Sequence, residues 1–217
     1  MKILYEDNHV IAVVKPHGVL TQSDQTNDSS LMDEVKRDLK ARYQKKGEVF
    51  LGLVHRLDRP VGGIVVFGKT SKGAARLSEQ FRERTVVKKY LAVVEGCPKM
   101  REGRVVLWLK KNEATNRVTT FSSETPGTQR AELFYRVLET RPHNRALVEI
   151  MPATGRPHQI RVSMQFLGCP IVGDTKYGAK TSTEGKIALF AHELTFHKPV
   201  GGEPITLHAE PDLPIFS

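Results

Sequence analysis

The sequence has few cysteines and no long hydrophobic segment. Only Cys97 and Cys169 occur among its 217 residues, and neither has a cysteine or histidine nearby at metal-ligand spacing. This usage favours a reduced cytoplasmic protein without structural zinc. No apolar run approaches the length of a membrane span, and the first residues lack the apolar stretch of a secretory signal. We therefore expect a cytoplasmic protein with neither a membrane nor a metal partner.

The sequence also lacks the short motifs of several enzyme classes. It contains neither glycine-rich phosphate-binding loop, which argues against nucleotide-driven chemistry, and no Gly-x-Ser-x-Gly nucleophile elbow. Its histidines do not form an evident ligand set. His192 and His197 are five residues apart on a predicted strand, while His55, His158 and His208 are scattered. Structural histidines are favoured over metal ligands.

Basic residues, in contrast, are abundant. The sequence has 33 lysines and arginines against 24 acidic residues, a formal net charge of +9. Such an excess favours a polyanionic partner, most often nucleic acid. The basic clusters lie at 36–37, 45–46, 82–84, 88–89 and 110–111, within several predicted elements. This spread is typical of a broad binding surface rather than of a disordered tail.

The hydrophobic pattern predicts an α+β protein with a mixed, mostly antiparallel sheet flanked by helices and loops. Strands are expected at 10–14, 52–54, 63–67, 89–96, 188–196 and 204–208, with an antiparallel meander at 105–109, 117–121, 131–138 and 146–150. After a polar loop at 21–30, one helix should begin near Ser29 or Ser30 and another near Thr70 or Ser71; a third should run from Pro157 to about Leu167. Regular βαβ alternation is absent, which excludes a doubly wound parallel sheet.

Two clusters of residues are candidates for an active site. Asp58 lies between Arg56 and Arg59, after one apolar run and before a Gly-Gly pair and a second run. A carboxylate in such a loop is either an aimed nucleophile or one half of an ion pair. The second cluster, 153–162, leads from a glycine turn into a helix. Its start could hold an anion, and Arg161 one turn later could pair with Asp58. Tyr90 begins a strand, where packing is the commoner role of a tyrosine.

Together these clusters resemble the RNA pseudouridine synthases of the RluA type. The matching stretches, in order, are Lys15-Pro16-x-Gly18, His55-Arg56-Leu57-Asp58-Arg59 with Gly63, Lys89-Tyr90, Gly155-Arg156-x-His158-Gln159-Ile160-Arg161-Val162, and 167–178. The similarity runs from about Ile3 to Leu213. It implies an enzyme that isomerises uridine in RNA to pseudouridine without a cofactor.

The resemblance also assigns roles to individual residues. Asp58 is then the catalytic aspartate, which either attacks the nucleotide or assists cleavage of its glycosidic bond. Tyr90 stacks on the base and is a candidate for proton transfer, Arg161 pairs with the aspartate, and Arg56 helps to displace the target base. The remaining substrate-binding candidates are His55, Arg59, Lys89, Arg156, His158 and Gln159. The chemistry agrees, since a target base must leave its stack and be held against a planar side chain.

The chain departs from the family pattern at a few positions. Val61-Gly62 stands where many relatives have Thr-Ser, so hydroxyl groups near the Asp58 loop are missing or replaced. Phe190 and Lys198 stand where relatives often have histidine. These differences affect the expected choice of substrate more than the reaction.

We expect residues 1–217 to form one pseudouridine synthase catalytic domain of two fused subdomains, without a separate N-terminal RNA-binding domain. It should act as a monomer on a stem-loop of tRNA or ribosomal RNA. Two alternatives stay open. One is a non-catalytic RNA-binding or RNA-folding factor that retains the fold. The other is a hydrolase that uses Asp58 on a small sugar, which would require a second carboxylate as general acid.

Overall fold

The computed structural model describes residues 1–24 and 28–216. Positions 25–27, part of the predicted polar loop at 21–30, lie outside the described residues. The chain forms two compact units. Unit 1 contains Met1–Lys88 and Ala191–Pro211, and unit 2 contains Lys89–Phe190 and the residues from Asp212 onward. The chain passes between the units within β5 (Val87–Glu95), within β10 (Leu189–His197), and again between Pro211 and Asp212.

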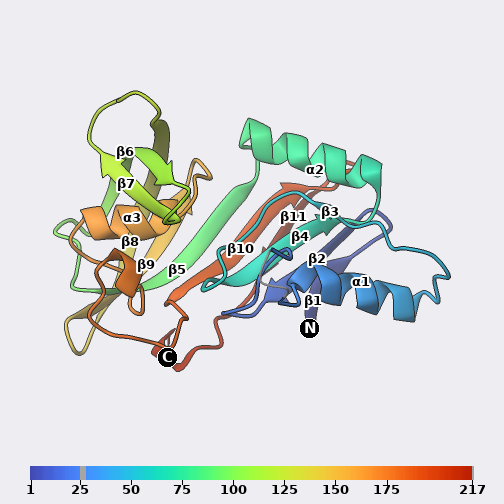
Figure 1. The fold of residues 1–217 in the computed structure, drawn as a ribbon, viewed down its shortest axis with the longest axis horizontal. Coiled ribbons are helices and arrows are strands. Elements are labelled where there is room, and N and C mark those ends of the chain that lie inside the picture. Colours follow the sequence, from blue (N-terminus) through green and yellow to red (C-terminus); the bar gives the residue numbers. More distant parts are fainter. Residues whose placement is uncertain (25–27, 217) are drawn as a thin grey trace. The chain divides into compact units, whose positions relative to one another are not determined.

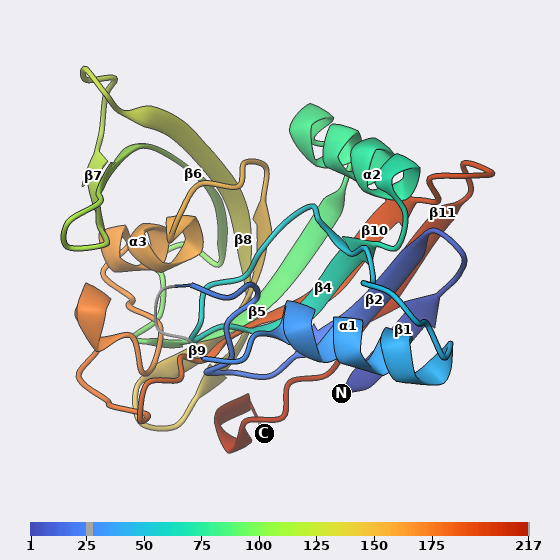
Figure 2. The same cartoon turned by 45° about the vertical axis from the view of Figure 1, so that its right-hand side comes forward.

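Unit 1 is built on strands whose apolar runs form its core. The strands β1 (Lys2–Glu6), β2 (Val10–Lys15), β4 (Gly62–Gly68) and β10 lie side by side in that order; β3 (Gly52–Leu53) pairs with β4 and β11 (Pro204–His208) with β10. All seven residues of β4 are buried. A strand buried along its whole length needs cover on both faces. Figures 1 and 2 show α2 (Ser71–Glu83) and α1 (Leu31–Arg42) on either side of these strands.

The two helices of unit 1 begin at the predicted capping residues. Ser30 caps α1 and forms a reciprocal capping box with Asp33, while the Thr70 side chain accepts a hydrogen bond from the Gly73 amide at the start of α2. These bonds satisfy amide groups that a helix leaves without partners at its first turn. Leu31, Val35 and Leu39 of α1 are buried at helical spacing, as the pattern predicted.

Unit 2 is the predicted antiparallel meander. Its strands β5, β9 (Arg145–Pro152), β8 (Gln129–Arg141), β6 (Glu102–Asn112) and β7 (Arg117–Phe121) are neighbours in that order, and each pairing is antiparallel. Buried and exposed residues alternate along β6 and β8, so one face of the sheet forms the core of this unit. The helix α3 (Gln159–Phe166) contacts β6 and β7.

The α+β class and the antiparallel meander are confirmed, with one strand that was not predicted and one helix that begins later than predicted. The strand β1 was not predicted, because its residues are at most half-buried and carry little apolar periodicity. The third helix begins at Gln159 instead of Pro157, because the preceding His158 has a left-handed backbone with φ of 52° and cannot belong to a helix. Within the described residues, every helix is too short or too polar to cross a membrane.

Candidate active site

Asp58 lies in unit 1, in the loop between β3 and β4. Leu57, the residue before Asp58, is held by the buried Thr21 hydroxyl. This hydroxyl donates to the Leu57 carbonyl at 2.9 Å and accepts from the Leu57 amide at 3.2 Å. On the other side, the Val61 amide donates to the Asp58 carbonyl at 3.0 Å and closes a turn. The backbone on both sides of the half-buried Asp58 is thus fixed by hydrogen bonds, which limits where its carboxylate can point.

Lys15, at the end of β2, supports the same loop from inside the protein. Its side chain is fully buried, and its ammonium group donates to the carbonyls of Pro16, Val19 and Arg59 at 3.1, 2.7 and 3.2 Å. Burial lowers the pKa of Lys15 to about 7, against the attraction of the Asp58 carboxylate, which raises it. Lys15 therefore links the end of β2 to the loop that carries the candidate catalytic carboxylate.

The two arginines that flank Asp58 are both exposed. The Arg59 guanidinium donates to the Gly18 carbonyl at 3.0 Å and pairs with Asp28 at 2.8 Å, and the Gly18 amide donates to the Arg59 carbonyl at 2.8 Å. Arg59 therefore contributes to the loop's structure. Arg56 lies exposed on the loop before Asp58. Such a position leaves its guanidinium accessible to RNA.

His55 connects this loop to β4 and α2. Its Nε2 accepts a hydrogen bond from the Val66 amide at 3.0 Å, and its ring stacks on Phe81 of α2 with centroids 4.6 Å apart. Burial lowers the pKa of His55 to about 3, helped by the positive charge of Lys88, so the ring stays neutral at physiological pH. His55 therefore braces the loop, and its predicted contact with the substrate stays a prediction.

The Val61-Gly62 departure has a physical explanation in unit 1. A Cβ atom on Gly62 would lie 2.5–3.0 Å from three atoms of the buried His17 ring, closer than side chains pack. Gly63 has φ of +123°, and a Cβ there would meet the Ala191 backbone at 2.4 Å. Gly62 is therefore fitted to the His17 ring, and Gly63 to the backbone of β10 at Ala191.

Unit 2 carries the other predicted site residues. Lys89 and Tyr90 are half-buried on β5, where Tyr90 faces Ile150 of β9 across the ladder. Ile150 is in turn opposite Tyr135 of β8, so these three side chains follow one row across the sheet. The pairing of β5 with β9 fixes the backbone position of Tyr90 within unit 2.

Arg161, on α3, forms a buried bidentate ion pair that the sequence did not reveal. Its Nε and Nη2 donate to the two carboxylate oxygens of Asp174 at 2.7 and 2.8 Å, and the two side chains are 6% and 1% exposed. The guanidinium also lies 4.9 Å above the centre of the Tyr177 ring. A paired and stacked arginine has one well-defined orientation. Asp174 directly follows Gly173 in the stretch 167–178 that resembles the family. This match was the only indication in the sequence that Asp174 belongs to the site.

Tyr177 joins this arrangement to the start of α3 and to β7. Its hydroxyl accepts a hydrogen bond from the Val118 amide at 2.9 Å and lies 2.6 Å from His158 Nδ1. Burial raises the pKa of Tyr177, so the phenol is un-ionised at physiological pH. His158 therefore takes part in holding the Arg161 network.

Gln159 and Arg156 shape the turn before α3. The buried Gln159 amide accepts from the Thr154 hydroxyl at 2.7 Å and from the Arg156 amide at 3.0 Å, and donates to the Glu132 carbonyl at 2.9 Å. These bonds engage both the oxygen and the nitrogen of the side-chain amide, so Gln159 positions the turn before α3; its predicted substrate contact stays a prediction. The Arg156 Nε donates to the Arg130 carbonyl at 3.1 Å.

The predicted catalytic residues thus fall in different units. Asp58 belongs to unit 1, with Lys15 and Thr21 around it, whereas Tyr90 and Arg161 belong to unit 2. Within unit 2, Arg161 forms its ion pair with the carboxylate of Asp174. The predicted pairing of Arg161 with Asp58 stays a prediction.

Comparison with known proteins identifies the family. The model of the family described as RNA pseudouridylate synthase matches residues 9–166, which is most of the chain. The chain belongs to this family, whose members are isomerases that convert uridine to pseudouridine in RNA.

Individual relatives agree with this assignment. The chain is 34% identical over 220 residues to the dual-specificity RNA pseudouridine synthase RluA of Haemophilus influenzae, which covers 98% of this chain and 94% of that protein. It is 34% identical over 211 residues to the ribosomal large subunit pseudouridine synthase C of Rickettsia felis, covering 96% of this chain and 67% of the relative. The solved structure of human RNA pseudouridylate synthase domain containing 4 has a TM-score of 0.80 at 27% identity, covering 97% and 89% of the two chains.

Proposed function

We propose that this chain isomerises specific uridines in structured tRNA or ribosomal RNA to pseudouridine, with Asp58 as the catalytic aspartate. The observation that supports this role most directly is the construction of the Asp58 loop. Thr21 and Lys15 fix the backbone on either side of a carboxylate that stays partly exposed. Catalysis requires an accessible side chain whose position is rigidly supported, whereas a purely structural ion pair does not need to be accessible.

The reaction redistributes bonds within one nucleotide. The bond between ribose C1′ and uracil N1 breaks, the uracil turns, and C1′ bonds to C5, while the hydrogen on C5 exchanges with solvent and N1 gains a hydrogen. Asp58 acts at the sugar or base of the flipped nucleotide. The Tyr90 ring gives the detached uracil a planar surface on which to turn, and Arg161 stabilises the negative charge of Asp58.

RNA recognition rests on the basic surface. Arg56 is exposed beside Asp58, and Lys89 stands next to Tyr90, so cations flank both candidate catalytic residues in the chain. With a net charge of +9, attraction to the phosphate backbone provides affinity that does not depend on sequence. We propose that the protein acts in the cytoplasm as a monomer, on stem-loops whose shape selects the target uridine.

Release of tritium from RNA labelled at C5 of uridine tests the activity. Wild-type protein should release tritium from total tRNA or ribosomal RNA, and Asp58→Ala should release none while binding the same RNA with similar affinity. The matched control is Glu83→Ala, which removes an exposed carboxylate of unit 1 at the end of α2 and should leave turnover near wild type. RNA binding without tritium release by the wild type would instead favour a non-catalytic RNA-binding factor.

A further inference from the structure

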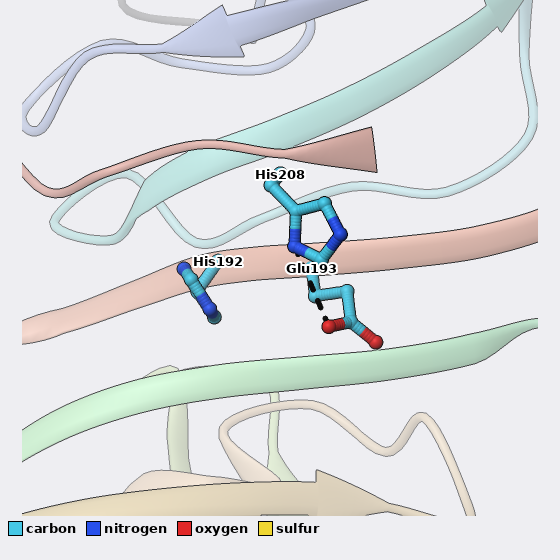
Figure 3. A group of neighbouring side chains, drawn as sticks. All are labelled: His192, Glu193 and His208. Atoms are coloured by element: carbon cyan, nitrogen blue, oxygen red, sulfur yellow. Dashed lines mark ion pairs between the residues drawn. The ribbon is translucent and has the colours of Figure 1, made fainter. Parts of the chain in front are cut away.

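The ladder between β10 and β11 in unit 1 brings together two imidazoles and a carboxylate. One ligand atom from each of His192, Glu193 and His208 lies within 4.8 Å of the other two, and Figure 3 shows these side chains near one another. Glu193 and His208 are direct cross-strand partners, with Glu193 Oε2 3.5 Å from His208 Nδ1. Spacing in the sequence does not indicate this group, because the histidine near His192 is His208 on the neighbouring strand and not His197 on the same strand.

A backbone hydrogen bond sets the tautomer of His192. Its Nδ1 lies 2.9 Å from the Ala209 carbonyl oxygen, which can only accept, so Nδ1 carries the hydrogen and Nε2 keeps the lone pair. Histidines that bind metals are usually oriented in this way, with the other ring nitrogen donating to a carbonyl or carboxylate. The Ala209 amide donates to the His192 carbonyl at 2.9 Å, which fixes the backbone that carries both groups.

The burial of the three side chains suits a site that opens to solvent. The side chains of Glu193 and His192 are 14% and 21% exposed, and that of His208 is 56% exposed. Two ligands are therefore held against the protein while the third can move. Glu210 Oε1 lies 4.0 Å from His192 Nδ1, the nitrogen that donates to Ala209, and water can occupy the remaining coordination positions on the Nε2 side.

We propose that His192, Glu193 and His208 bind a divalent transition-metal ion of the Zn²⁺ class. Two imidazole nitrogens and one carboxylate oxygen form a donor set that zinc accepts, whereas Mg²⁺ and Ca²⁺ prefer oxygen ligands alone. Tetrahedral zinc places its ligand atoms about 3.3 Å apart. The three side chains must therefore draw together slightly, and the exposed His208 has the freedom to do so.

Such an ion would join β10 to β11 and stabilise unit 1. None of its ligands belongs to the proposed catalytic or RNA-binding residues, so the inference stands or falls separately from the proposed function. A ligand that binds only the folded state shifts the unfolding equilibrium by mass action. Zn²⁺ is therefore expected to raise the melting temperature of the protein.

The test is a titration of the metal-free full chain with Zn²⁺, followed by calorimetry, together with the visible absorption of bound Co²⁺. We expect one ion per chain at all protein concentrations and a higher melting temperature with Zn²⁺. His192→Ala, His208→Gln and Glu193→Gln should each weaken binding roughly tenfold or more. His197→Ala, which removes an exposed histidine of the same strand, is the matched control and should bind as the wild type does.

Two results would overturn the proposal. One is equal Zn²⁺ affinity in the wild type and all three ligand variants. The other is a stoichiometry that depends on protein concentration with growth in light scattering, which would show that Zn²⁺ only bridges surface histidines of separate molecules. Because His208 is largely exposed, its glutamine variant should fold, and melting of each variant without metal checks this.

Discussion

The contact between Gly62 and His17 gives the sharpest prediction about the loop region. Gly62→Ala places a methyl group 2.5–3.0 Å from three atoms of a ring that is only 8% exposed and has little room to move. Forcing an extra carbon into a well-packed site typically costs about 1–3 kcal/mol. We expect the free energy of unfolding to fall by about that amount, and to fall at least as far in Gly62→Ser, which adds a hydroxyl to the same Cβ.

A double-mutant cycle isolates this effect. His17→Ala removes the ring and should allow the Gly62→Ala methyl to fit, so the double variant should be more stable than the sum of the single changes by about 1 kcal/mol or more. Gly47→Ala is the matched control, because a Cβ there meets nothing within 4 Å, and its stability should stay within about 0.5 kcal/mol of wild type. Urea unfolding measures all four proteins. Additive single changes, or a Gly62→Ala cost no larger than that of Gly47→Ala, would refute the reasoning.

Further predictions concern the supports of the site and its charge. Asp174→Asn leaves the buried Arg161 charge poorly paired, so tritium release should drop at least tenfold and stability should fall by about 3–5 kcal/mol; an unchanged rate would count against the positioning role. Thr21→Val removes the hydroxyl that bridges the backbone before Asp58 and should lower turnover more than RNA affinity, which filter binding and tritium release separate. Because burial lowers the pKa of Lys15 from 10.5 to about 7, the folded state binds fewer protons than the unfolded state between these values. The free energy of unfolding should therefore rise with pH across this window, by about 5 kcal/mol at most, and parallel pH curves for wild type and Lys15→Met would contradict this. RNA affinity should fall steeply as salt increases, and a flat response would refute the role given to the basic surface.

The fold was largely predictable because most of its elements have clear periodicity. The strands β6 to β9 alternate apolar and polar residues, and α1 and α2 begin at residues that cap helices. The exceptions are local. The left-handed φ of His158 shortens α3, and composition does not signal such a conformation at a residue other than glycine. The strand β1 has little buried surface, so its pairing with β2 depends on tertiary context.

The site was predictable in its position more than in its contacts. The apolar runs around Asp58 indicated a loop anchored to a core, and the structure places it between β3 and β4. Its supports come from distant parts of the chain: Thr21 is 36 residues from Leu57, and Lys15 is 44 residues from Arg59. Spacing in the sequence carries no information about contacts at that range, and for the same reason Asp174 was not recognised as the partner of Arg161.

The most direct test of the central claim follows one uridine. RNA from cells that lack this gene should be missing pseudouridine at one or a few positions, and purified wild-type protein should restore it there in vitro. Asp58→Ala, added at a concentration that gives the same RNA occupancy, should restore none. Restoration by Asp58→Ala at a rate close to that of the wild type would contradict the account, because the loop that Thr21 and Lys15 support would then not carry the chemistry.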